Sequence, residues 1–180
     1  MGPPCWSRGI PRVFIPEDFH PPESGVNIMK DWSEFEKIQR KKFPEYGVAV
    51  FELFWPAGDI TVLSREGLLS GPLPDSDLIF ITGYNPGRLR PTDLQNQKAN
   101  QYLQSALQKA DLSFYRALGR NQERTHEEPS FAVALETGPQ KFQLAYISSL
   151  AGSLGQAALF YWDGNARKGR TLWLVTDEES

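Results

Sequence analysis

The polar residues that could do chemistry in this 180-residue sequence fall into three short segments. Amide, carboxylate and guanidinium side chains suit a small polar or anionic ligand, such as a nucleotide or an amino acid, and a tyrosine could form an aromatic wall. The candidate ligand-binding residues are Tyr84, Asn85, Arg88, Arg90, Glu128, Ser130 and Gln156. We therefore expect a small-ligand-binding or protein-interaction module, provided that the fold brings the three segments together.

A catalytic alternative rests on the middle segment. His126 and Glu128 lie two positions apart on one polar stretch, close enough to share a proton as an acid-base pair. No matched nucleophile accompanies them, because Ser130 lacks the strand-turn-helix setting of an activated serine and Cys5 lies near the start of the chain. With Glu127 the segment could also offer metal ligands, but one cysteine and two histidines in the whole chain favour no metal site. No cofactor is expected.

A third hypothesis is the binding of RNA or another single-stranded nucleic acid on an open sheet face. Exposed aromatic and apolar residues would be needed there, and Phe80, Phe131 and Val133 are the candidates. The net charge of -3 and the absence of the aromatic motif of RNA-recognition domains make this hypothesis the weakest of the three.

The composition is that of a folded globular protein, with 40% hydrophobic residues and 11 Phe, 6 Tyr and 5 Trp. No apolar run approaches the roughly 20 residues of a membrane span, and the first residues lack the apolar core of a secretory signal. We therefore expect a cytoplasmic protein. Residues 1–45 are interpreted as a Pro-rich arm plus a short helix, and residues 46–176 as a single α+β domain.

The elements that must position the candidate residues centre on the apolar run 78–82, which predicts a strand buried on both faces. Asn85-Pro86-Gly87 then fits a type II turn, and Thr92 is a good N-cap for a helix over 93–111. Other predicted helices span 34–42 and 137–154, the latter stopped by Gly155. Further predicted strands are 48–54, 60–63, 114–118, 130–135, 157–162 and 171–175, and loops are predicted over 67–77 and 119–129.

From residue 78 onward the order strand, helix, strand, strand, helix, strand is typical of the ferredoxin-like (split βαβ, βαββαβ) antiparallel sheet. A β-hairpin, a helix and the Pro-rich arm would be added at its amino-terminal side. In this topology the connections 84–86, 119–130 and 155–156 meet at one end of the sheet. The hairpin over 48–63 could cover the open sheet face, and an exposed edge over 48–54 could pair with a second chain.

The same three segments carry a resemblance. ITGYNP at 81–86, EPSF at 128–131 and LGQAA at 154–158 resemble the signature of a bacterial family of uncharacterised proteins, domain of unknown function 3293. The resemblance covers roughly residues 46–176. Gly83 stands where the family has alanine, a departure that leaves the turn intact. The family has no established activity, so the resemblance supports only the fold and the location of the site.

Overall fold

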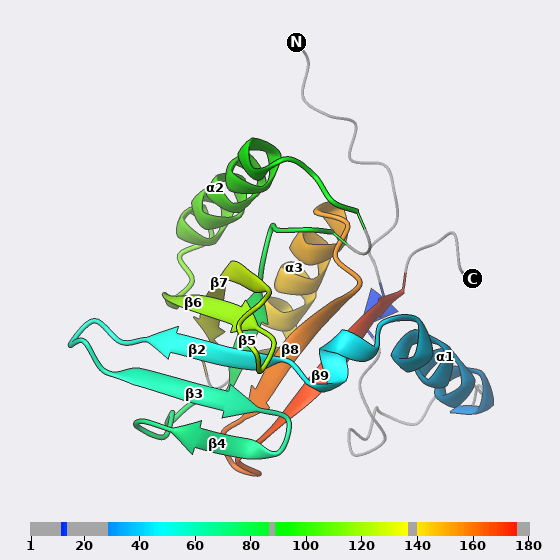
Figure 1. Ribbon diagram of the computed structural model, residues 1–180, viewed down its shortest axis with the longest axis horizontal. Coiled ribbons are helices and arrows are strands. Elements are labelled where there is room, and N and C mark those ends of the chain that lie inside the picture. Colours follow the sequence, from blue (N-terminus) through cyan, green and yellow to red (C-terminus); the bar gives the residue numbers. More distant parts are fainter. Residues whose placement is uncertain (1–11, 14–28, 87–88, 137–139, 176–180) are drawn as a thin grey trace.

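The computed structural model describes residues 12–13, 29–86, 89–136 and 140–175. It is a mixed α+β structure built around an antiparallel sheet (Figure 1). The helices are α1 (Met29–Lys42), the 3-10 helix η1 (Pro44–Gly47), α2 (Asp93–Lys109) and α3 (Gln140–Ser153). The strands are β1 (Arg12–Val13), β2 (Val50–Phe54), β3 (Ile60–Ser64), β4 (Gly67–Ser70), β5 (Leu78–Ile81), β6 (Phe114–Arg120), β7 (Glu127–Ala134), β8 (Ala158–Asp163) and β9 (Lys168–Val175).

The strands form one sheet in the order β1-β9-β8-β5-β7-β6-β2-β3-β4, with all neighbours antiparallel. The central strand β5 lies between β8 and β7, with Phe80 opposite both Phe160 and Ala132. All four residues of β5 are buried, as predicted from their uninterrupted apolar character. The predicted hairpin is confirmed as β2 and β3.

The helices α2 and α3 cover one face of the sheet (Figure 1). Because side chains alternate along a strand, Ile79 and Ile81 of β5 point to this face and pack in one core with Leu103, Leu107 and Ile147. The first turn of α2 is fixed by a capping box between Thr92 and Gln95, so the predicted N-cap is confirmed.

The opposite face is enclosed by the sheet itself, which is nearly barrel-shaped. The hairpin of β3 and β4 contacts β9, and Gly169 N donates to Arg65 O at 3.0 Å. Glycine permits this approach, because a Cβ at Gly169 would lie 2.9 Å from the backbone oxygen of Ser64 in β3. A second core fills the enclosed space, and its buried members include Leu53, Leu63 and Trp162.

Several sequence-based predictions differ from the structure. The segment 67–77 contains the strand β4, and β2 is not a sheet edge, because it lies between β6 and β3. A second chain therefore cannot pair along β2 as expected. Helix α1 begins at Met29 rather than at residue 34, and its residue Ile38 is 53% exposed. The predicted start of α3 at 137–139 lies outside the described residues.

The segment before β2 contacts the sheet through aromatic rings. Phe43 and Tyr46 lie 6.2 Å and 5.4 Å, centroid to centroid, from Trp173 of β9. At the same edge Arg12 and Val13 pair with Val175 and Leu174. The division of the chain after residue 45 remains a prediction. Among the described residues, no helix has the length and apolar character needed to cross a membrane.

Candidate functional site

The structure brings the three polar segments together at one end of the central strand. Asn85 lies in the turn that follows β5, and its Nδ2 donates to Glu128 Oε1 at 2.9 Å. Gln156, which follows α3, donates from Nε2 to the backbone carbonyl of Tyr84 at 3.0 Å. Residues 72 positions apart in the chain are therefore in direct contact, as the predicted topology requires.

The turn after β5 is held from two sides. Thr82 Oγ1 donates to Pro129 O at 2.8 Å and accepts from Tyr84 N at 3.0 Å. On the other side, Gly83 N donates to Asn100 Oδ1 of α2 at 3.0 Å. A Cβ at Gly83 would lie 2.8 Å from backbone atoms of α2, so the glycine permits this close approach.

Asn85 occupies the left-handed region, with φ of 43°, a conformation that asparagine tolerates better than most residues. Its Oδ1 accepts from Asn96 Nδ2 at 2.9 Å, and its backbone N donates to Asn96 Oδ1 at 3.0 Å. Asn96 is buried on the first turns of α2. A continuous chain of hydrogen bonds thus links α2, the turn and the start of β7.

A cavity of about 380 Å³ opens beside this network. Its apolar floor contains Phe51, Phe80 and Phe160, whose ring centroids lie 4.3–5.6 Å apart, with Phe51 and Phe160 stacked. Its polar lining includes Thr82, Asn85, Arg90, Arg120, Asn121, His126, Glu128, Ser130 and Gln156. The volume lies within the range of small-molecule sites, roughly 300–1,000 Å³.

The segment from η1 to β2 supplies another wall of the cavity, with Glu45, Tyr46, Val48 and Ala49. Burial raises the pKa of the Tyr46 hydroxyl, and the nearby charge of Glu128 raises that pKa further. The phenol therefore keeps its proton at neutral pH and can act as a hydrogen-bond donor inside the cavity.

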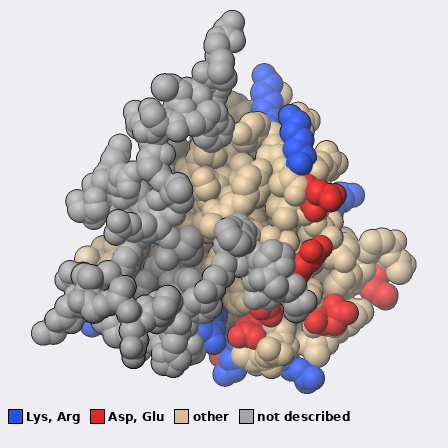
Figure 2. Space-filling model, turned by 180° about the vertical axis from the view of Figure 1, so that it is seen from behind, with Lys and Arg blue, Asp and Glu red and all other residues tan. Residues whose placement is uncertain are grey.

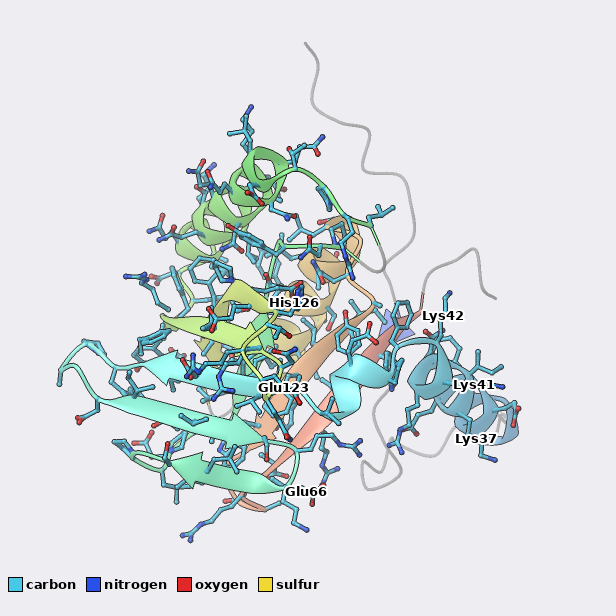
Figure 3. All side chains as sticks on the ribbon, in the orientation of Figure 1. Lys37, Lys41, Lys42, Glu66, Glu123 and His126 are labelled. Carbon is cyan, nitrogen blue, oxygen red and sulfur yellow. The ribbon has the colours of Figure 1, made fainter. Side chains whose placement is uncertain are left out.

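His126 Nε2 lies 2.9 Å from Glu128 Oε1, so the predicted pair is in contact. Figure 3 shows His126 on the β6–β7 connection, well away from Lys37 and Lys41, which project from α1. Two contacts with Asn121 hold the loop: Asn121 N donates to His126 O, and His126 N donates to Asn121 Oδ1, each at 3.2 Å.

A buried carboxylate anchors the same loop from the other face of the sheet. Glu52 of β2 accepts from Arg120 Nε at 2.9 Å and also from Arg124, whose second nitrogen lies 3.1 Å from Glu127 Oε1. The Glu52 side chain is 7% exposed. This ion-pair cluster fixes the loop that presents His126.

The other predicted site residues are placed as follows. Ser130 is buried in the cavity wall and donates to Glu128 O at 3.0 Å. Arg90 lines the cavity from the exposed rim, where it donates to Leu89 O at 3.1 Å. Tyr84 contributes its backbone carbonyl and is not among the residues that line the cavity. Arg88 and Gly87 lie outside the described residues, and Pro86 O accepts from Leu89 N at 3.0 Å.

Sequence reasoning missed Tyr46, Asn96, Phe51 and Phe160 as site residues. A signal existed for Asn96, a polar residue on the inner side of the α2 spacing beside Leu103 and Leu107. The part played by Phe51 depends on how far the sheet curls, which no local pattern reports.

The nucleic-acid hypothesis is not supported by its candidate residues, because Phe80, Phe131 and Val133 are all buried. Phe131 and Val133 also lie on the helix-covered face, whereas Phe80 faces the enclosed core. On the side seen in Figure 2, the described Lys and Arg side chains are interspersed with Asp and Glu. Within the described ranges, no cluster of three or more His, Cys, Asp or Glu residues could hold a metal ion.

The fold and this cavity define an α+β domain with a candidate site at the end of its central strand. The sequence model of one family, described as "Protein of unknown function (DUF3293)", matches residues 81–159. The resemblance is therefore confirmed over these residues, which contain all three polar segments, although the match is narrower than the expected 46–176. No curated protein and no solved structure matches the chain.

Proposed function

We propose that the protein binds a small ligand, with a flat apolar body and a polar edge, in the cavity beside Asn85 and Glu128. The observation that carries this proposal is the joining of two surfaces in one cavity of about 380 Å³. The half-buried ring of Phe51, stacked on Phe160, offers an apolar face, and the hydrogen-bonded network offers fixed polar groups. Sites of this kind fix a ligand's orientation with a few polar groups on an apolar wall.

A polar or anionic ligand, including a nucleotide, would suit this site. The exposed guanidinium of Arg90 at the rim could pair with an anionic group of a ligand whose ring lies on the floor. The ligand would be met in the bacterial cytoplasm, the location expected for this chain.

The ferredoxin-like interpretation of the core is part of the same proposal. The order β8-β5-β7-β6 with antiparallel neighbours supports it, because a split βαβ core pairs its four strands in that way. The strands β2, β3 and β4 then extend this core at one edge, and β9 extends it at the other.

An enzyme using an acid-base pair is the second candidate function. It is favoured by the 2.9 Å contact between His126 Nε2 and Glu128 Oε1 on the cavity wall. Such a pair could move a proton to or from a bound molecule, so binding and catalysis would share one site.

The test is a thermal-shift screen against nucleotides, amino acids and other small anions, run in parallel on the wild type and Gly119→Val. A Cβ at Gly119 would lie 3.2 Å from Phe51 Cε1 and 3.6 Å from Ser130 Oγ, so valine would occupy the cavity. Because β-branched residues suit strands, the backbone of β6 should accept it. Gly47→Ala is the control, since its Cβ would meet only the end of the Arg65 side chain at 3.8 Å.

A ligand at 100 times its dissociation constant should stabilise the wild type and Gly47→Ala by about 2.7 kcal/mol. The same ligand should leave Gly119→Val unshifted. A screen in which no class stabilises the wild type would overturn the proposal and favour a protein partner. A shift that persists in Gly119→Val would place the ligand elsewhere on the molecule.

A further inference from the structure

The hydrogen-bonding atoms that the cavity leaves open indicate what its ligand must carry. This inference depends on the proposed function, because it concerns the same cavity.

The orientation of the asparagine pair is forced by Glu128. A carboxylate only accepts, so Asn85 must turn its Nδ2 toward Glu128 Oε1. Its Oδ1 then faces Asn96 Nδ2, and Asn96 Oδ1 in turn faces the backbone N of Asn85. Every member of this chain is therefore directed by the next, and both ends of the Asn85 amide are held by a protein partner.

The other donors near the floor are also committed. Ser130 Oγ donates to Glu128 O, and Thr82 Oγ1 donates to Pro129 O. Gln156 must turn its NH2 group toward Tyr84 O, because a carbonyl oxygen can only accept. These contacts hold the wall together, and they use both hydroxyl donors and one of the two N–H groups of the Gln156 amide.

Two acceptor oxygens remain. No described residue donates to Gln156 Oε1, and none donates to Glu128 Oε2, since both Asn85 and His126 contact Glu128 Oε1. Gln156 is 5% exposed, so a ligand that covers its oxygen without donating to it would leave a buried acceptor without a hydrogen bond. The network therefore selects for N–H or O–H groups on the ligand.

One donor complements the two acceptors. The Tyr46 hydroxyl makes no hydrogen bond to any residue in the described part of the chain, and Tyr46 lines the same cavity. A phenol can donate to a ring nitrogen or a carbonyl oxygen. The groups without a partner beside the phenylalanine floor thus include two acceptors and the Tyr46 donor.

We propose that the ligand is a planar nitrogen heterocycle with an amino group next to a ring acceptor, of the aminopurine type. Its amino group donates to the open oxygens of Glu128 and Gln156, its ring acceptor meets the Tyr46 hydroxyl, and its ring lies on Phe51. An acidic substituent on such a ring system, for instance a ribose phosphate, would reach the rim, where Arg90 is exposed.

The experiment compares two probes that differ only in this feature. AMP carries an amino group on its purine ring, whereas IMP carries a carbonyl oxygen and a protonated ring nitrogen at the corresponding positions. Titration calorimetry on the full chain should give AMP a dissociation constant at least about tenfold lower than that of IMP, because IMP turns an acceptor toward the open oxygens. In Glu128→Gln, whose amide can donate, the ratio should fall toward one or reverse.

The outcomes separate this inference from the proposed function. Equal binding of the two probes, or tighter binding of IMP, that is lost in Gly119→Val would overturn the amino-group inference and leave the site in place. If another class of ligand bound and neither AMP nor IMP did, the amino-group inference would also be overturned and the site would stay in place. Absence of binding by any class would overturn both. The wild-type ratio is decisive even if Glu128→Gln fails to fold, which its thermal unfolding curve would reveal.

Discussion

Asn85 Nδ2 donates a 2.9 Å hydrogen bond to Glu128 Oε1, which joins the turn after the central strand to the first residues of β7. The two residues are 43 positions apart, and both are partly buried. This bond sets the orientation of Asn96 and leaves Glu128 Oε2 without a donor among the described residues. The hydrogen-bonded network of the site should therefore depend on a donor at the Nδ2 position of Asn85.

Asn85→Asp should destabilise the protein by about 1–3 kcal/mol, because a carboxylate would replace the donor with an acceptor and face a second carboxylate. Chemical unfolding at neutral pH measures the change. Gln104→Glu is the matched control, since it makes the same amide-to-acid change at an exposed position of α2. Equal free energies of unfolding for the two variants would contradict the account of the network.

Gly83→Ala should lower the free energy of unfolding by about 1–3 kcal/mol, because its methyl group would require α2 to move. The Cβ would lie 2.8 Å from Ala99 C and from Asn100 N. Gly47→Ala, in open surroundings, should be neutral or slightly stabilising. If denaturant titrations showed that neither substitution changes the free energy of unfolding, the close packing of α2 against Gly83 would be contradicted.

Glu52→Ala should cost about 3–5 kcal/mol, because it leaves the guanidinium of Arg120, 12% exposed, without its partner. It should also loosen the loop that carries His126. Glu34→Ala removes a carboxylate from an ion pair whose side chains are 67–74% exposed, and it should change the free energy of unfolding by less than about 0.5 kcal/mol. Urea titration measures the free energy of unfolding of both variants. Equal values would contradict a stabilising role for the buried ion-pair cluster.

Alkaline pH should weaken the fold through Tyr161. Burial raises the pKa of its hydroxyl above the ordinary 10.0, and the hydrogen bond to Asp77 raises that pKa further. Above about pH 10 the unfolded chain loses this proton while the folded chain keeps it, so stability falls as pH rises. The free-energy difference between wild type and Tyr161→Phe should be constant from pH 7 to 9 and shrink toward pH 11. A difference that stays constant to pH 11 would contradict the shift.

The sequence was sufficient to predict the meeting of the three polar segments, because the direction of an antiparallel chain decides which connections share an end. Asn85, Glu128 and Gln156 were located in this way. The roles of Tyr46 and Phe51 could not be predicted, since they depend on how far the sheet curls and on where the chain before β2 is held. That position depends on the contacts of Phe43 and Tyr46 with Trp173, more than a hundred residues away in the chain.

The same limit explains the errors in the fold. The strand β4 lies in a stretch of glycine, serine and proline whose local character favours a loop, and it is held by pairing with β3. The burial of Phe80 beneath β2 and β3 likewise depends on a long-range closure. Local patterns report which residues are apolar, but not which of two sheet faces each one meets.

An NMR titration of protein with ring-labelled phenylalanine, using the ligand that gives the largest thermal shift, would show whether the ligand enters this cavity. Chemical-shift changes are expected at Phe51, Phe80 and Phe160, which form the cavity floor. Phe114 and Phe131, which pack against each other on the helix-covered side, should remain unperturbed. Perturbation of Phe114 and Phe131, with unchanged signals from the three floor rings, would contradict the assignment of this cavity as the binding site.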